Sequence, residues 1–121
     1  MSENNESSEI TELQITDVVN GDGPTAQAGQ EVIVHYTGWL YDTSQPDNKG
    51  TKFDSSVDRG EPASFPLNRV IPCWTEGVQK MMVGGKSKLV CPSDTAYGDA
   101  GQGPIPGGAA LVFEVELLAI E

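Results

Sequence analysis

Residues 72–85 read PCWTEGVQKMMVGG, and here the spacing of apolar residues changes from that of a strand to that of a helix. Its apolar residues at helical spacing are Trp74, Val78, Met81 and Met82. Pro72 stands near the first turn and Gly84-Gly85 follows the last apolar residue, which are start and stop signals of a helix. The pattern predicts one short helix of two to three turns whose apolar stripe covers another element.

Alternation of apolar and polar residues on both sides of this stretch predicts β-strands. The clearest is residues 31–38, EVIVHYTG, which continues toward Tyr41. The further predicted strands lie at residues 10–19, 63–67, 88–91 and 111–117. Pro66 places the strand at 63–67 at an edge or a bulge, because proline cannot donate to a ladder. One helix against several antiparallel strands gives an α+β domain.

A tail and two long loops complete the predicted organisation. Residues 1–9, MSENNESSE, contain three acidic residues, no basic one and no apolar residue after Met1, so we expect a disordered acidic tail. The domain then spans residues 10–121. Residues 42–52, DTSQPDNKGTK, and residues 92–108, rich in Gly and Pro, are predicted to be loops.

The composition limits the partners. The chain has 121 residues, which fits one domain, and its 7 Lys and Arg against 18 Asp and Glu give a net charge of −11. A surface this negative repels phosphate backbones and anionic lipid, so nucleic acid and membrane surfaces are poor partners. No apolar run approaches the roughly 20 residues that span a bilayer, and the first residues lack the pattern of a signal peptide. We expect a cytoplasmic protein.

The sequence offers little conventional catalytic chemistry. It has no nucleophile elbow, no phosphate-binding loop and no His-x-x-x-His pair, and His35 is its single histidine. Cys73 and Cys91 stand 18 positions apart without the spacing of a zinc site or a disulfide framework. Packing as small apolar residues is the favoured interpretation for this pair, and a redox pair is the alternative. We expect no metal and no cofactor, with a calcium site in the loop at 42–52 as a minor alternative.

An aromatic set is the remaining candidate for a site. It comprises Tyr36, Phe53, Phe65, Trp74, Tyr97 and Phe113. Such residues ordinarily form core. The alternative is a concave apolar pocket with a few polar groups, the usual form of a ligand site. Periodicity alone does not choose between the two.

Seven separated motifs carry a resemblance that does choose. They are residues 34–38 (VHYTG), 53–56 (FDSS), 58–60 (DRG), 70–78 (VIPCWTEGV), 96–98 (AYG), 105–106 (IP) and 111–118 (LVFEVELL). In order and approximate spacing they closely resemble the FKBP-type peptidyl-prolyl cis-trans isomerases, over about residues 13–121. The resemblance implies a half-barrel antiparallel sheet of five or six strands wrapped around one short helix, with the active site between helix and sheet.

Carried over motif by motif, the resemblance also implies roles for single residues. The implied catalytic residues are Tyr36, Asp54, Trp74, Tyr97 and Phe113. The implied substrate-binding residues are Phe53, Arg59, Phe65, Val70, Ile71 and Ile105. Trp74 takes the place of the pocket floor under a prolyl ring, and Arg59 that of the partner which positions Asp54. The backbone N–H of Ile71 and the hydroxyl of Tyr97 take the places of donors to ligand carbonyls.

The activity implied by the resemblance is isomerisation of X-Pro bonds in proline-containing polypeptides, by desolvation and orientation in the aromatic pocket. Tacrolimus and rapamycin are implied as ligands in the same way. The alternatives are a binding module that holds a peptide or macrolide in this pocket without turnover and, last, a holdase-like chaperone. Two departures from the family pattern lie near the pocket: Cys73 stands where Gly is usual, and the Gly-rich loop at 98–108 is about one residue shorter.

Overall fold

The computed structural model describes residues 12–79, 81–98 and 100–121. Its strands are β1 (Gln14–Val19), β2 (Glu31–Tyr41), β3 (Lys49–Ser55), β4 (Ala63–Pro66), β5 (Lys86–Cys91) and β6 (Leu111–Ile120). Its helices are α2 (Ser56–Arg59) and α3 (Pro72–Val78), with 3-10 turns η1 (Pro46–Asn48) and η2 (Ser93–Thr95). The predicted tail at residues 1–9 lies outside the described residues, and the domain boundary at residue 10 stays a prediction.

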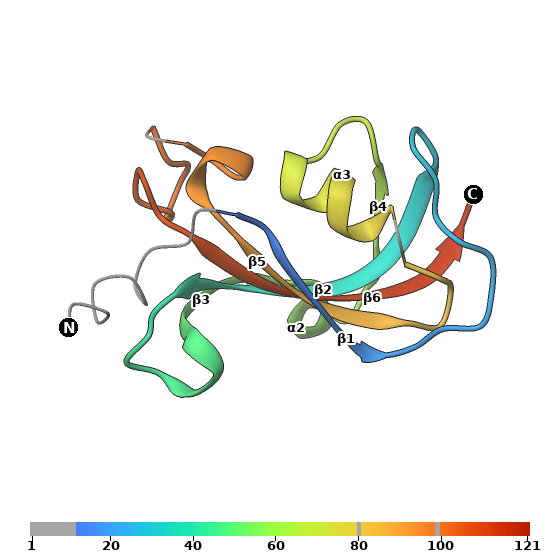
Figure 1. The fold of residues 1–121 in the computed structure, drawn as a ribbon, viewed down its shortest axis with the longest axis horizontal. Coiled ribbons are helices and arrows are strands. Elements are labelled where there is room, and N and C mark those ends of the chain that lie inside the picture. The colour runs from blue at the N-terminus through green and yellow to red at the C-terminus, as the bar shows by residue number, and fades with distance from the viewer. Residues whose placement is uncertain (1–11, 80, 99) are drawn as a thin grey trace.

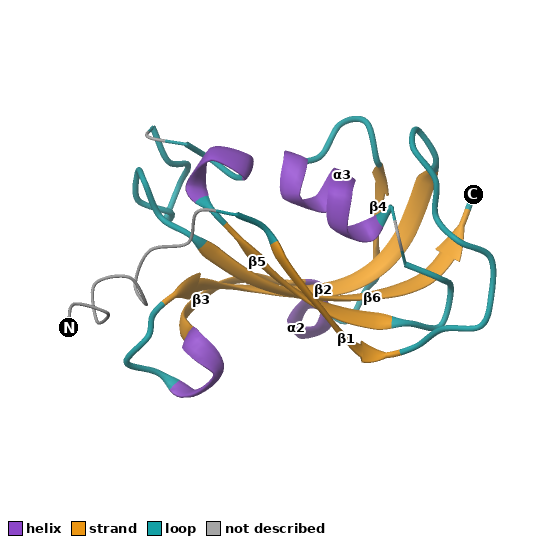
Figure 2. Ribbon diagram, viewed as in Figure 1, coloured by secondary structure: helices purple, strands orange, loops and turns teal. Residues whose placement is uncertain are grey.

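The six strands form one open antiparallel sheet in the order β1-β5-β6-β2-β3, with β4 also paired to β2. α3 lies across one face of this sheet (Figures 1 and 2). The expected fold class, an antiparallel sheet of five or six strands around a short helix, is confirmed. α2 adds a single turn of four residues. Within the described parts of the chain, no helix is long and apolar enough to cross a membrane.

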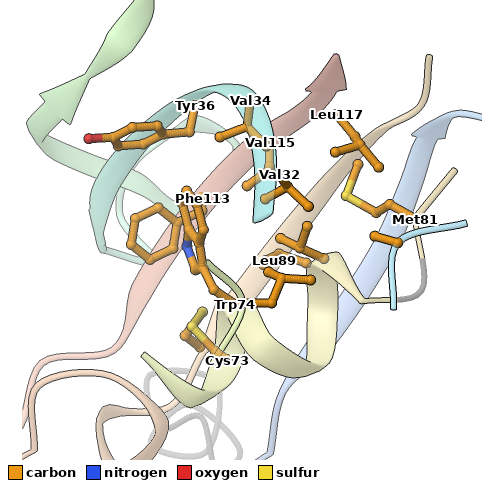
Figure 3. Close-up of a cluster of buried hydrophobic side chains, with 14 of the residues drawn as sticks. Val32, Val34, Tyr36, Cys73, Trp74, Met81, Leu89, Phe113, Val115 and Leu117 are labelled. Carbon is orange, nitrogen blue, oxygen red and sulfur yellow. A yellow bond between two sulfur atoms is a disulfide. The ribbon is translucent and has the colours of Figure 1, made fainter. Parts of the chain in front are cut away.

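β2 is the central strand, and its side chains alternate as predicted. Val32 and Val34 are fully buried and Tyr36 is nearly so, whereas the residues between them are half-buried. β6 pairs with β2 along one side, and β4 and β3 pair with the two halves of its other side. The core therefore lies between the Val32 face of the sheet and α3 (Figure 3).

α3 begins where predicted and ends earlier. Ile71 is extended (φ −61°, ψ 150°), and Pro72 is the first helical residue, where its missing N–H costs nothing. The helix stops at Val78, so the predicted extension to residues 81–82 is wrong. The chain beyond the helix pairs with an earlier segment instead, and the N–H of Ala26 donates to the carbonyl of Met81 at 2.8 Å. Met81 is nevertheless buried, which is why its apolar character resembled a helical stripe.

The predicted loop at residues 42–52 is also shorter than expected, because β3 already begins at Lys49. Lys49 pairs with Tyr41 in the β2 ladder. Its ammonium group forms an ion pair with Glu114 and lies 4.4 Å from the ring centroid of Trp39. These two contacts of Lys49 stabilise the start of β3. The strand therefore includes residues whose polar character is typical of a loop.

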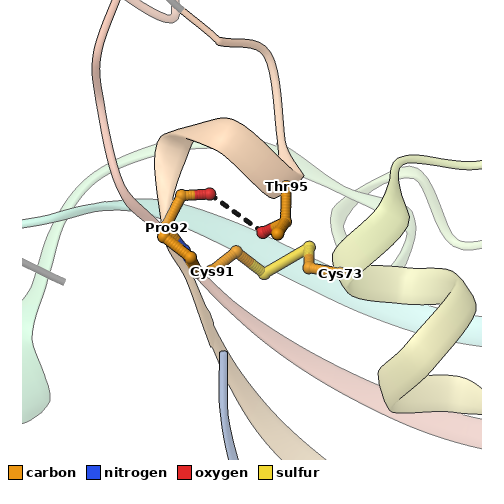
Figure 4. Close-up of a disulfide and its surroundings, with 4 residues drawn as sticks. All are labelled: Cys73, Cys91, Pro92 and Thr95. Atoms are coloured by element: carbon orange, nitrogen blue, oxygen red, sulfur yellow. Dashed lines mark hydrogen bonds between the residues drawn. A yellow bond between two sulfur atoms is a disulfide. The ribbon is translucent and has the colours of Figure 1, made fainter. Parts of the chain in front are cut away.

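Cys73 and Cys91 form a disulfide, with Cα atoms 5.7 Å apart (Figure 4). The favoured sequence interpretation, separate packing of two thiols, is therefore wrong. Gly77 lies one turn after Cys73 on the same face of α3, and a Cβ on Gly77 would lie 2.7 Å from Cδ2 of Leu89. Because Leu89 and Cys91 share a face of β5, the close approach at Gly77 brings the two cysteines together.

Replacing both cysteines by alanine removes a cross-link between residues 18 positions apart. We expect the free energy of unfolding to fall by about 3 kcal/mol, because the unfolded chain regains the freedom that the cross-link withheld. Urea unfolding of the double alanine variant and of the wild type measures the loss. A more expanded unfolded chain also raises the denaturant slope m. A loss of stability with an unchanged m would contradict this explanation, since it would indicate lost packing alone.

Candidate functional site

A pocket of about 320 Å³ lies between α3 and the sheet. Its lining residues are Tyr36, Phe53, Asp54, Phe65, Arg69, Val70, Ile71, Trp74, Tyr97 and Phe113. Nine of them are among the eleven site residues named from the sequence. The lining residues come from β2, β3, β4, α3, β6 and the loops before α3 and after η2, so the fold brings together side chains that lie up to 77 positions apart.

Trp74 is the centre of the aromatic set. Its indole meets the rings of Tyr36, Phe65 and Phe113 edge to face, with centroids 5.2, 5.3 and 5.5 Å apart. Figure 3 shows Trp74 beside Phe113 and below Tyr36, at one end of the core. Trp74 is 4% exposed, and its Nε1 has no hydrogen-bond partner among the described residues. The side chain that forms the floor of the pocket is therefore also part of the core. Its buried N–H group destabilises the fold by about 1 to 3 kcal/mol while it has no acceptor.

Gly38 leaves room for two aromatic rings in one wall of the pocket. A Cβ at this position of β2 would lie 2.7 Å from Phe53 and 2.7 Å from Phe113. The two rings instead pack edge to face over it, with centroids 5.7 Å apart. Glycine inside a strand is typical of such a close approach, and this signal was available in the sequence.

Three polar side chains form a network at the edge of the pocket. The hydroxyl of Tyr36 donates to Oδ2 of Asp54 at 2.5 Å, and the guanidinium of Arg59 binds Oδ1 of the same carboxylate. Arg59 also donates to the hydroxyl of Tyr36 at 3.2 Å. Arg59 does not itself line the pocket; it reaches the network from outside, and both charges of the pair are compensated.

The local sequence places each member of this network. Asp54 lies opposite Gly38 in the ladder of β2 and β3. Arg59 is the last residue of α2. Ser55 caps the start of this helix, because its hydroxyl accepts from the N–H of Asp58, and Gly60 caps the end in the left-handed region (φ 76°). A four-residue helix with both ends capped thus turns the chain so that Arg59 folds back onto Asp54.

The network shifts the acidity of its members. Burial and the hydrogen bond to Asp54 raise the pKa of Tyr36. Burial alone would raise the pKa of Asp54, but hydrogen bonds from Tyr36 and Arg59 and the charge of Arg59 lower it below its ordinary value. Burial, followed by the charge of Asp54, raises the pKa of Tyr97. At neutral pH the pocket thus holds two neutral phenols and one carboxylate neutralised by arginine.

Ser56 supports Tyr36 from behind the pocket, and sequence reasoning did not single it out. On one side of β2, the partners β4 and β3 leave residues 35 and 36 without a strand neighbour. The buried hydroxyl of Ser56 fills this gap, accepting from the N–H of Tyr36 at 2.8 Å. Nδ1 of His35 lies 2.9 Å from the same hydroxyl, so His35 makes a structural hydrogen bond away from the pocket.

The sequence of the domain matches a known family. A model of the FKBP-type peptidyl-prolyl cis-trans isomerases matches residues 23–118. This chain belongs to that family. It is 62% identical over 101 residues to the FKBP-type peptidyl-prolyl cis-trans isomerase FkpA of Aeromonas hydrophila, covering 84% of this chain and 35% of that protein. It is 47% identical over 105 residues to FK506-binding protein 1B of Neurospora crassa, covering 85% and 93%.

A solved structure of an isomerase of this family has a similar fold. The crystal structure of FkpA from Escherichia coli superposes with a TM-score of 0.81 at 45% identity, covering 90% of this chain and 48% of that one. The chain therefore spans about a third to a half of the FkpA proteins and nearly the whole of the Neurospora relative.

Two further residues of this FKBP-type domain differ in placement from the rest of the implied site. Ile105 is 6% exposed, belongs to the buried core and does not line the pocket; its backbone pairs with that of Gln102 in a tight turn. Arg69, which belongs to no predicted site, does line the pocket. Within the described residues, no group of three His, Cys, Asp or Glu side chains could hold a metal ion.

The lowered pKa of Asp54 predicts how stability depends on pH. Folding favours the ionised carboxylate, so its contribution is present above the ordinary pKa of about 3.9 and is lost as the pH falls through the lowered folded value. We expect Asp54→Asn to destabilise the domain at pH 7 by at most about 1 kcal/mol, since the ion pair is partly exposed. Urea unfolding of both proteins should show this difference shrinking as the pH falls below about 3.9. A difference that is constant between pH 7 and pH 3 would contradict the assignment.

Proposed function

We propose that this chain catalyses cis-trans isomerisation of X-Pro peptide bonds, with the prolyl ring held in the aromatic pocket over Trp74. The observation that carries the proposal is the pocket itself, in which three rings surround a buried indole beside a neutralised carboxylate. The family match to peptidyl-prolyl cis-trans isomerases supports it.

The reaction needs no nucleophile. Rotation about a peptide bond must break amide resonance, a barrier of about 18 to 20 kcal/mol, whereas the two X-Pro isomers differ by only about 0.5 to 1 kcal/mol. The planar amide is more polar than the twisted one, so water stabilises the ground state more than the transition state. A pocket lined by rings removes that water, and a lowering of the barrier by about 5.5 kcal/mol gives roughly 10⁴-fold acceleration.

Two free donors support the proposed orientation of the substrate. Among the described residues, the hydroxyl of Tyr97 and the backbone N–H of Ile71 make no hydrogen bond with the protein. Both belong to residues that line the pocket. In our proposal they hold carbonyl groups of the substrate on either side of the prolyl ring, while Phe65, Val70 and Phe113 enclose the ring.

The remaining polar residues have supporting roles in this proposal. Asp54 lies beside the rotating amide with Tyr36, and Arg59 positions Asp54 and neutralises its charge. Neutralisation matters because an unpaired carboxylate would draw water into the pocket. Ile105 keeps its implied place near the substrate as a prediction only.

We propose proline-containing polypeptides as substrates and tacrolimus and rapamycin as competing ligands. The cytoplasmic location stays a prediction, and the disulfide is an observation against it, because disulfides persist mainly in oxidising compartments.

The first test is the cis-to-trans rate of a short X-Pro peptide, measured without a coupling protease, with and without the purified chain. We expect acceleration that rapamycin abolishes. If the chain binds rapamycin but does not accelerate rotation, it is a binding module that uses the same pocket without turnover. If it does neither, the pocket assignment is wrong.

Two variants separate the pocket from the histidine. Trp74→Leu keeps an apolar side chain but removes the indole, and we expect kcat/KM to fall at least about tenfold as the three rings lose their shared partner. His35→Ala removes the hydrogen bond to Ser56, and its kcat/KM should stay within about twofold of the wild type. Circular dichroism checks that both variants are folded. The opposite ranking would contradict the proposed mechanism.

A further inference from the structure

Among the described residues that line the pocket, Arg69 is the one that carries an uncompensated charge. The other charged residue of the lining, Asp54, is neutralised by Arg59 and by the hydroxyl of Tyr36. The guanidinium of Arg69 is exposed and makes no ion pair or hydrogen bond with any other described residue. Because Arg69 is exposed whereas Trp74 is buried, Arg69 adds an unpaired positive charge at the solvent-exposed end of the pocket, here called its mouth.

This arrangement differs from that of the other described basic side chains, all of which have partners. Lys49 and Lys86 pair with Glu114, Lys52 pairs with Asp58, and Lys88 donates to the carbonyl of Asp47. The chain has 18 acidic residues and 7 basic ones. Although carboxylates are in such excess, none of the described ones pairs with Arg69. Its guanidinium therefore remains available to a ligand at the mouth of the pocket.

The backbone holds Arg69 in place at this mouth. Its N–H donates to the carbonyl of Pro66 at 3.0 Å, which closes the turn after β4. Leu67 in the same turn is fully buried, and its carbonyl accepts from the hydroxyl of Thr75 in α3 at 2.9 Å. These two hydrogen bonds fix the backbone of Arg69 relative to Trp74. The side chain of Arg69 has no partner among the described residues.

We propose that Arg69 determines substrate specificity, favouring X-Pro segments with an acidic residue directly before or after the proline. The inference rests on the proposed function, because the prolyl ring must occupy the pocket for its neighbours to reach the mouth. Neighbouring residues of a peptide lie 3.8 Å apart, within the reach of an arginine side chain. A guanidinium binds a carboxylate through two parallel hydrogen bonds, which an amide or an ammonium group on the substrate cannot match.

The size of the effect follows from the exposure of Arg69. An exposed ion pair changes binding by a small factor, so we expect kcat/KM for a Glu-containing peptide to exceed that for its Gln analogue about two- to fivefold. A Lys analogue should fall below Gln. The net charge of −11 repels acidic peptides at long range, but salt at 0.15 M screens interactions beyond about 8 Å and leaves the local contact.

The test uses the full chain and two sets of peptides that differ in one residue, Glu, Gln or Lys, placed before the proline in one set and after it in the other. Each catalysed rate is divided by the uncatalysed rate of the same peptide. We expect the Glu preference in at least one set, its loss in Arg69→Gln, and partial retention in Arg69→Lys. Lys88→Gln, the matched control, removes the same charge outside the pocket and should keep the preference.

The outcomes separate this inference from the proposed function. Turnover of the Gln peptides by both the wild type and Arg69→Gln tests the isomerase activity alone. A preference for Glu that survives in Arg69→Gln, or equal rates for Glu and Gln in both peptide sets, would overturn the role of Arg69 while leaving the isomerase intact. A preference that disappears equally in Lys88→Gln would also overturn it, since total charge rather than the pocket mouth would be responsible.

Discussion

The packing of one buried indole against three aromatic rings holds the helix, the sheet and the pocket together. Trp74 stands in α3, and its partners come from β2, β4 and β6, so this contact joins the helix to three strands. A buried aromatic side chain removes about 150 to 250 Å² from water, worth roughly 4 to 6 kcal/mol at 25 cal/mol per Å² as an upper bound. The same atoms that stabilise the fold therefore form the floor of the pocket, and the site cannot loosen without loosening the core.

The polar residues of the pocket are arranged so that the charge beside this apolar core is compensated. Asp54 is the single carboxylate among the described residues of the lining, and it is bound by a phenol and a guanidinium from two different elements. α2 turns the chain so that Arg59 contacts Asp54. The hydroxyl of Ser56, the first residue of α2, accepts a hydrogen bond from the backbone N–H of Tyr36. One short helix thus supports the strand through Ser56 and the network through Arg59.

The sequence predicted the elements whose burial is regular and missed those fixed by single contacts. β2 was readable because its buried and half-buried positions alternate. The start of β3 was not, since Lys49 is held by an ion pair and an aromatic face that no periodicity reports. The end of α3 was misplaced because Met81 is buried by pairing with Ala26 rather than by the helix.

The site shows the same division. The aromatic residues could be listed from the sequence, but they come from separate segments, and only the resemblance to a family chose a pocket over a core. Arg69 lies in a turn without any pattern, and the role proposed for it depends on the absence of a partner among the described residues. The disulfide likewise requires knowing that Gly77 lets α3 approach β5.

That disulfide also affects how freely the parts of the pocket move. Cys73 directly precedes Trp74, and Cys91 ends the strand that leads through η2 to Tyr97. The cross-link therefore joins the floor of the pocket to the strand that leads to Tyr97, and it limits how far these two parts can move apart. A ligand that touches both then has less disorder to remove when it binds, so more of its contact energy is left for the twisted amide.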